Sequence, residues 1–277
     1  MEWEKYTPEE REAMRGLEFM RYEDAPQRNK MSEAAFDLIS SICAAAAEDD
    51  FVWMHELAYN NAYEMASNAN NATFRALLAR AYEHAVASGD AESCCDLGNM
   101  YHETDNSGCV EDYATAASLY ELGIQRGCAQ CAVNLGYMYY YGRGTAVDYN
   151  KAFQCYAHAA LVDGNPEALW KLGDLYAGGK GAPQSDCLAW TMYCRARENA
   201  QGLPFGCRAS HHMADYLLEG IPGSLAPDPG RALKLYVEAE LGYYEEIARG
   251  LTYYQGCLEK ALAGQEKARA AVRQCDK

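Results

Sequence analysis

The residues of this chain best suited to chemistry are two close pairs of cysteines. Cys128 and Cys131 form a C-x-x-C, and Cys94 and Cys95 are adjacent at nearly the equivalent place one sequence repeat earlier. Thiols at this spacing can bind zinc or exchange a disulfide, and the alignment predicts that they approach one another at the starts of neighbouring helices. A single C-x-x-C without a second such pair is a weak metal signature. We therefore interpret these cysteines as small packing residues, predict no metal site, and keep a zinc or redox role as the alternative.

Histidines, glycine-rich loops and serines supply no stronger site. His211 and His212 project about 100° apart on a helix, which prevents them from chelating one ion together, so we interpret them as surface polar residues. The stretch 178–181 reads G-G-K-G, and a phosphate-binding loop requires Ser or Thr after the lysine. Neither Ser-x-x-Lys nor Gly-x-Ser-x-Gly occurs in the chain. The sequence therefore predicts no catalytic residue, no cofactor and no enzymatic activity.

A short motif that recurs four times indicates which elements hold these side chains in place. It is a small dipeptide inside an apolar segment: Leu97-Gly98, Leu135-Gly136, Leu172-Gly173 and Met213-Ala214. The second residues of these dipeptides lie 38, 37 and 41 positions apart. A period in this range is typical of stacked supersecondary units.

Within each period, the punctuation of the sequence predicts a pair of helices. Asp148 is a suitable N-cap for a second helix, and Asn165-Pro166 and Asp228-Pro229 are typical helix starts. We expect Gly127, Gly164 and Gly242 to follow helix C-termini, where a left-handed conformation is needed.

The repeated glycine falls inside the first helix of each pair, where it costs about 1 kcal/mol relative to alanine. Such a cost at every repeat implies a close approach between helices that a Cβ would obstruct. The second helices share a register of an alanine four residues before a tyrosine, at Ala116/Tyr120, Ala152/Tyr156, Ala189/Tyr193 and Ala232/Tyr236.

The motif is most complete between Ala132 and Gly144, where it reads L-G-x-x-Y-x-x-G-x-G from Leu135 onward. This pattern resembles the Sel1-like repeat, a relative of the tetratricopeptide repeat. The resemblance covers residues 89–242 well and continues to Gly256 as a degenerate fifth copy. It implies an all-α solenoid, a right-handed superhelix of antiparallel helix pairs.

The organisation that we predict has three parts. Residues 1–88 form N-terminal helices that include a diverged repeat and a cap, with a helix start at Thr7-Pro8. Residues 89–256 form the repeat array of about four clear copies and the degenerate fifth, and residues 257–277 form a C-terminal capping helix.

The resemblance also implies that the first helices line a concave surface, which directs attention to their variable positions. Two such positions, three residues apart on one helix face, differ from repeat to repeat. With one further tyrosine, these candidate partner-binding residues are Asp96, Asn99, Asn134, Tyr137, Tyr141, Lys171, Asp174, His212 and Asp215. We predict a non-enzymatic scaffold that binds a protein or extended peptide here. An ordinary solvated face is the alternative.

The charge of the chain narrows the choice of partner. The net charge is −16, and residues 1–60 carry 14 acidic and 6 basic side chains, or −8. Nucleic acids and anionic membranes require a basic face, so we expect neither as a partner. The first residues are acidic and contain no apolar segment, so we expect no secretory leader. No run of 18 apolar residues occurs in the sequence, and we expect a cytoplasmic protein with reduced cysteines. The sequence names neither the partner nor the oligomeric state.

Overall fold

The part of the chain that the computed structural model describes, residues 32–61, 65, 68, 71–102, 112–200, 204–248 and 251–275, is helical. It contains no strand, and its one isolated β-bridge joins Ile221 to Leu225. The helices are α3 (Glu33–Ala47), α4 (Phe51–Asn60), α6 (Ala72–Ser88), α7 (Glu92–His102), α8 (Tyr113–Gln125), α9 (Ala129–Tyr141), α10 (Tyr149–Val162), α11 (Pro166–Gly178), α12 (Asp186–Ala200), α13 (Pro204–Glu219), α14 (Pro229–Ala248), a 3₁₀ turn η3 (Thr252–Tyr254) and α15 (Gln255–Cys275). The helix start predicted at Thr7 lies outside the described residues.

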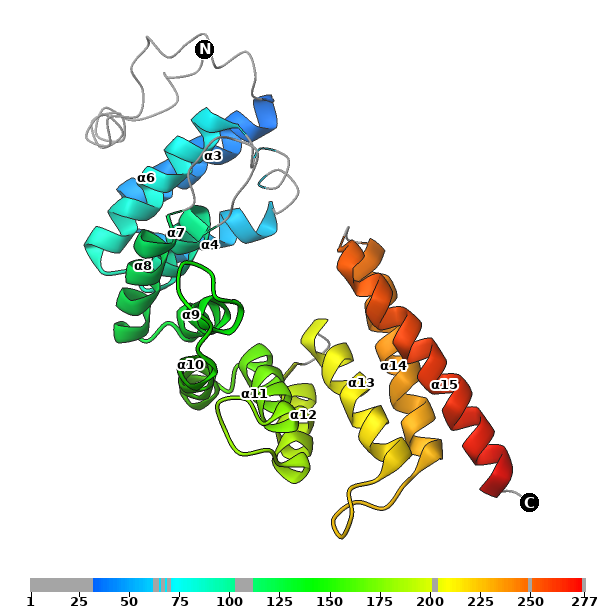
Figure 1. The fold of residues 1–277 in the computed structure, drawn as a ribbon. Coiled ribbons are helices and arrows are strands. Elements are labelled where there is room, and N and C mark those ends of the chain that lie inside the picture. The colour runs from blue at the N-terminus through cyan, green and yellow to red at the C-terminus, as the bar shows by residue number, and fades with distance from the viewer. Residues whose placement is uncertain are drawn as a thin grey trace. The chain divides into compact units, whose positions relative to one another are not determined.

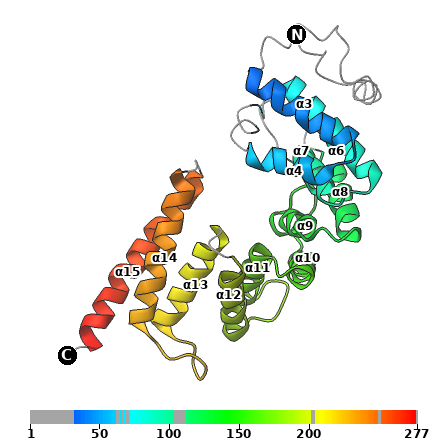
Figure 2. The ribbon, with the colours of Figure 1, turned by 180° about the vertical axis from the view of Figure 1, so that it is seen from behind.

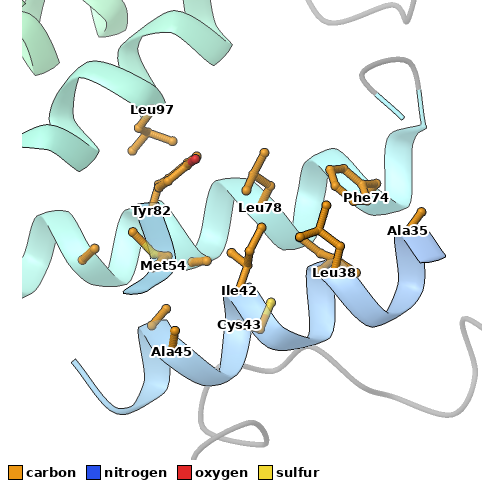
Figure 3. Close-up of a cluster of buried hydrophobic side chains, with 14 residues drawn as sticks. Ala35, Leu38, Ile42, Cys43, Ala45, Met54, Phe74, Leu78, Tyr82 and Leu97 are labelled. Atoms are coloured by element: carbon orange, nitrogen blue, oxygen red, sulfur yellow. The ribbon is translucent and has the colours of Figure 1, made fainter. Parts of the chain in front are cut away.

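The chain divides into two compact units, Met1–Cys131 and Ala132–Lys277. In the first unit α3 packs on α4 and α6, α6 packs on α7, and α7 packs on α8 (Figure 1). The core of this unit consists of apolar side chains from α3, α4 and α6, with Ile42, Met54 and Phe74 almost fully buried (Figure 3). Tyr82 of α6 extends this core toward Leu97 of α7.

The second unit continues as a series of neighbouring helices. α11 packs on α12, α12 on α13, α13 on α14, and α14 on α15 (Figures 1 and 2). The C-terminal helix α15 lies along α14. Among the described helices, none is both long and apolar enough to cross a membrane. These observations establish an all-α solenoid of helix pairs.

The caps that the sequence predicts explain where several of the helices begin and end. Asp148 accepts a hydrogen bond from the backbone N–H of Lys151, and Asn165 accepts one from Ala168. Gly127 and Gly164 have φ of +94° and +70°, which confirms their role after helix C-termini.

The prediction for Gly242 is wrong, because this residue lies inside α14. A Cβ at Gly242 would overlap the Cβ of Cys207 on α13. The glycine is therefore needed for the close packing of α13 on α14, and the helix continues through it.

The glycine of the repeated dipeptide lies directly beneath a tyrosine ring. A Cβ at Gly98 or Gly173 would be 2.5 Å from Cε1 of Tyr120 or Tyr193, respectively. The same contact at Gly136 would be 2.7 Å from Tyr156. The predicted close approach of the two helices is therefore confirmed in the first three pairs, and the second-helix tyrosine is the group that requires it.

In the fourth repeat, the tyrosine ring packs against a different small residue. Ala214 replaces the glycine, and the ring of Tyr236 lies against Gly264 of α15, where a Cβ would overlap it. Both Ala214 and Tyr236 remain buried. The C-terminal helix thus supplies the small residue that allows the last tyrosine to pack.

We expect Gly173→Ala to lower the free energy of unfolding by about 1–3 kcal/mol, because the added methyl must displace the Tyr193 ring. Gly178→Ala, in the same helix, is the matched control, since its nearest neighbour would be 3.6 Å away on flexible Lys180. That variant should be unchanged or up to about 1 kcal/mol more stable. Urea unfolding followed by circular dichroism measures both, and equal effects of the two substitutions would refute this role for Gly173.

Candidate functional site

The residue that follows the small dipeptide holds the hydroxyl of the second-helix tyrosine. Asn99 accepts a hydrogen bond from Tyr120 Oη at 2.7 Å. Asp174 accepts one from Tyr193 at 2.8 Å, and Asp215 accepts one from Tyr236 at 2.6 Å, so the same bond recurs in three repeats. Because the three tyrosines are buried, each hydroxyl needs such an acceptor. Three of the predicted partner-binding residues therefore also stabilise the fold.

The second repeat departs from this arrangement. Tyr137 occupies the acceptor position, and its own hydroxyl donates a 2.6 Å hydrogen bond to Glu167 Oε1. Its ring packs edge-on against Tyr156, with centroids 5.8 Å apart. The buried hydroxyl of Tyr156 is left without a hydrogen-bond partner. Tyr137 thus replaces an acceptor with an aromatic surface.

That surface surrounds the ammonium of Lys171, whose side chain is buried, with only 3% of the residue exposed. Its Nζ lies 4.3 to 5.6 Å from the centroids of four rings, in order of distance Trp170, Tyr140, Tyr137 and Tyr141. Such distances allow cation–π attraction. We call Tyr137, Tyr140, Tyr141, Trp170, Lys171 and Arg208 the aromatic–cation cluster.

Burial lowers the pKa of Lys171 to about 8, although the nearby charge of Asp174 opposes the shift. The Asp174 carboxylate is 3.9 Å from Nζ and is already bonded to Tyr193. At neutral pH Lys171 is therefore still mainly protonated, and it is held mostly by ring faces.

Arg208 of α13 extends the cluster toward the C-terminal end of the chain. Its Cζ is 4.4 Å from the centroid of the Trp170 ring and 4.5 Å from that of Tyr254, and its Nη2 donates to Tyr253 Oη at 3.0 Å. The Nε of Arg208 and the indole Nε1 of Trp170 are buried without hydrogen-bond partners. Two unmet donors therefore lie beside a buried lysine.

Of this cluster, the sequence predicted Tyr137, Tyr141 and Lys171 as site residues, and it did not predict Tyr140, Trp170 or Arg208. A signal was present, because Trp170 adjoins Lys171 and Arg208 precedes His212 by one helical turn. Pattern alone could not show that the two side chains stack on each other.

A small hollow lies one turn further along the same helices. Ala177, Tyr193, His212, Asp215, Tyr216 and Glu219 line its volume of about 260 Å³. The His212 ring stacks on Tyr193 with centroids 4.8 Å apart, and its Nε2 is 3.6 Å from Asp174 Oδ1. Lys171, Asp174 and His212 thus form a connected series across α11 and α13, while Asn134 is half-buried on α9.

The surface interpretation fails for His211. This residue is only 8% exposed, and its Nδ1 lies 2.9 Å from Tyr243 Oη. Burial lowers its pKa. The imidazole is a core group that links α13 to α14.

The remaining candidate of the first unit, Asp96, pairs with a histidine. His55 Nδ1 is 3.1 Å from Asp96, and its Nε2 is 3.0 Å from Asp90. Burial alone would lower the pKa of His55, but hydrogen bonds to Asp96 and Asp90 outweigh it and raise the pKa to about 9. Asp96 is therefore engaged in an ion pair between α4 and α7.

Three of the four candidate cysteines converge in the first unit. The sulfurs of Cys95, Cys128 and Cys131 all lie within 4.8 Å of one another. The fourth, Cys94, instead accepts a 3.4 Å hydrogen bond from Arg126 Nη1. The predicted approach of the thiols is thus realised by three sulfurs.

The sequence of this chain matches the model of one protein family. The family model described as "Sel1 repeat" matches residues 91–128, 129–161, 166–200 and 208–243, one helix pair each. No curated protein is significantly similar to the chain.

Two solved structures resemble the fold. The Sel1 repeat protein from Oxalobacter formigenes is 21% identical over 77% of this chain and 89% of its own, with a TM-score of 0.53. A protective antigen of uropathogenic Escherichia coli displaying an SLR fold, c5321, is 24% identical, with a TM-score of 0.54. That match covers 81% of this chain, which spans about half (49%) of the antigen's length. At these identities, the likeness shows the fold alone.

The hydroxyl of Tyr193 is hydrogen-bonded and that of Tyr156 is not, and this difference can be tested by substitution. Tyr193→Phe should cost roughly 1.5–3 kcal/mol of stability, because it removes a hydrogen bond to a charged acceptor. Tyr156→Phe should cost nothing or stabilise the protein, because it removes a buried hydroxyl that has no partner. Urea unfolding midpoints compare them, and equal losses would contradict the assigned hydrogen bonds.

The His55 ion pairs predict a pH dependence. The folded pKa of about 9 exceeds the usual 6.5, so the stabilisation is fully present below pH 6.5 and is lost as pH rises through 9. We expect His55→Gln to remove this component of the change in unfolding midpoint between pH 6 and pH 9. His158→Gln, an exposed histidine on α10, is the control and should keep the wild-type profile.

Proposed function

The chain belongs to the Sel1 repeat family, and we propose that it is a non-enzymatic scaffold that binds another protein or an extended peptide. The binding surface in this proposal runs along α9, α11 and α13. The observation that carries it is the aromatic–cation cluster, in which a buried lysine is surrounded by rings and adjoins two unmet donors.

The composition of the cluster favours recognition of a partner. Tryptophan, tyrosine and arginine dominate the energetics of protein interfaces, because they combine large apolar area with polar groups. The cluster reaches solvent at Tyr141, which is 53% exposed. Next to the cluster, Tyr253 contacts Arg208 and is 61% exposed. A partner that covers these rings would bury apolar surface on a rigid helical frame.

The charges suggest what such a partner carries. Lys171 and Arg208 are cations, and the Nε of Arg208 and Nε1 of Trp170 are donors without acceptors. A carboxylate that lies over the exposed rings at the rim of the cluster would be attracted by the two positive charges. The nearby hollow is instead lined by Glu219, whose carboxylate suits a basic side chain. We therefore propose a segment that carries both charges, and neither a nucleic acid nor a membrane.

We place this activity in the cytoplasm. The structure records no disulfide among the ten cysteines whose surroundings it describes, which suits a reducing compartment.

The test compares tyrosines of similar exposure on different helices. Tyr141→Ala combined with Tyr253→Ala should lower recovery of bound proteins in an affinity pull-down at least tenfold, equivalent to about 1.4 kcal/mol. Tyr244→Ala on α14 is the matched control, because Tyr244 is 50% exposed. Unchanged recovery with the double variant, or an equal loss with the control, would remove the cluster as the binding surface.

A further inference from the structure

Three thiols of the first unit meet although they come from two separate places in the sequence. Cys95 lies in α7, Cys128 immediately precedes α9, and Cys131 lies in the first turn of α9. Their sulfurs are mutually within 4.8 Å, and the three residues are 0–8% exposed. We call these residues the thiol triad.

The spacing of the sulfurs suits a single metal ion. Three sulfurs that each lie about 2.3 Å from one ion are roughly 4 Å from one another. The separations in the thiol triad therefore need only a small adjustment of side-chain torsions. A disulfide would use two sulfurs, such as those of the C-x-x-C, and would leave the third without a role.

The surroundings provide space and hydrogen bonds for this group. Gly123 of α8 lies against it, and a Cβ there would overlap Cys131 Sγ. The backbone N–H of Cys131 donates to Cys128 Sγ at 3.4 Å, and Asn99 Nδ2 lies 4.0 Å from Cys95 Sγ. Such donors orient sulfur ligands and offset their negative charge.

A fixed cation contacts Cys94, the residue that precedes Cys95 in α7. Arg126 Nη1 is 3.4 Å from the sulfur of Cys94 and also donates to the carbonyl of Val86 at 2.8 Å. Its guanidinium is therefore held in place by backbone, at the sulfur of Cys94. Positive charge at this point favours an anionic metal–thiolate group.

We propose that the thiol triad binds one soft metal ion, Zn²⁺ or Cu⁺, through three thiolates. Soft sulfur ligands select these ions over Mg²⁺, Ca²⁺ or Mn²⁺. On binding, three S–H protons pass to the buffer and three metal–sulfur bonds form, with no change in oxidation state. The ion would tie α7 to the start of α9 and so join two consecutive repeats. This site is independent of the aromatic–cation cluster.

The experiment adds Zn²⁺ alone or Cu⁺ alone to the full chain, purified in reductant without metal. Native mass spectrometry should show one equivalent bound for at least one of the two ions, and the melting temperature should rise, because the folded state alone assembles the site. Mg²⁺ should have no such effect. If neither soft ion binds at one equivalent, or if the chain only forms a disulfide, the proposal is wrong.

Cysteine-to-serine variants test whether the thiol triad is the place where the ion binds. Cys95→Ser combined with Cys128→Ser should abolish both the bound equivalent and the rise in melting temperature. Cys155→Ser combined with Cys194→Ser, on α10 and α12, is the matched control and should keep both. Metal retained by the first variant, or lost from the second, would place it elsewhere.

A further measurement needs no substitution, in case the first variant does not fold. Wild type is alkylated with N-ethylmaleimide just below its melting midpoint, and peptide mass spectrometry then identifies the modified cysteines. Bound metal should protect Cys95, Cys128 and Cys131 and leave labelling of Cys187, which is exposed, unchanged. Equal labelling of the three with and without metal would overturn the assignment.

Discussion

The packing of a second-helix tyrosine onto a glycine of the first helix is the constraint on which the repeats depend. In the Tyr193 example, the ring occupies the space that a Cβ of Gly173 would fill, and its hydroxyl is held by the neighbouring Asp174. The two requirements fall on adjacent residues of one helix. A large apolar ring can therefore be buried completely while its polar end remains satisfied.

This constraint limits which residues are free to serve a partner. Where Asn99, Asp174 and Asp215 hold a tyrosine, their polar groups are already engaged in the fold. The second repeat gives up this bond, since Tyr137 points its hydroxyl to Glu167 instead. The ring so gained forms one wall around Lys171. The binding surface that we propose thus arises where the structural rule is relaxed.

A protein of this architecture positions side chains from separate repeats on a common frame. Trp170 and Arg208 come from different helix pairs, and their stacking depends on the distance between α11 and α13. The thiol triad depends in the same way on the distance between α7 and the start of α9. Each site is therefore sensitive to how neighbouring repeats pack, because no single repeat contains it.

The sequence by itself determined the helix pairs, because their signals are local. The cap at Asp148, the proline start at Pro166 and the left-handed Gly164 act within a few residues. It also predicted that a mid-helix glycine marks a close contact. The tertiary structure alone decided that Gly242 stays helical, that His211 is buried, that Lys171 lies among rings, and which three of the four thiols meet. These outcomes depend on helices about 30 or more residues apart in the chain, and periodicity does not encode the distance between their side chains.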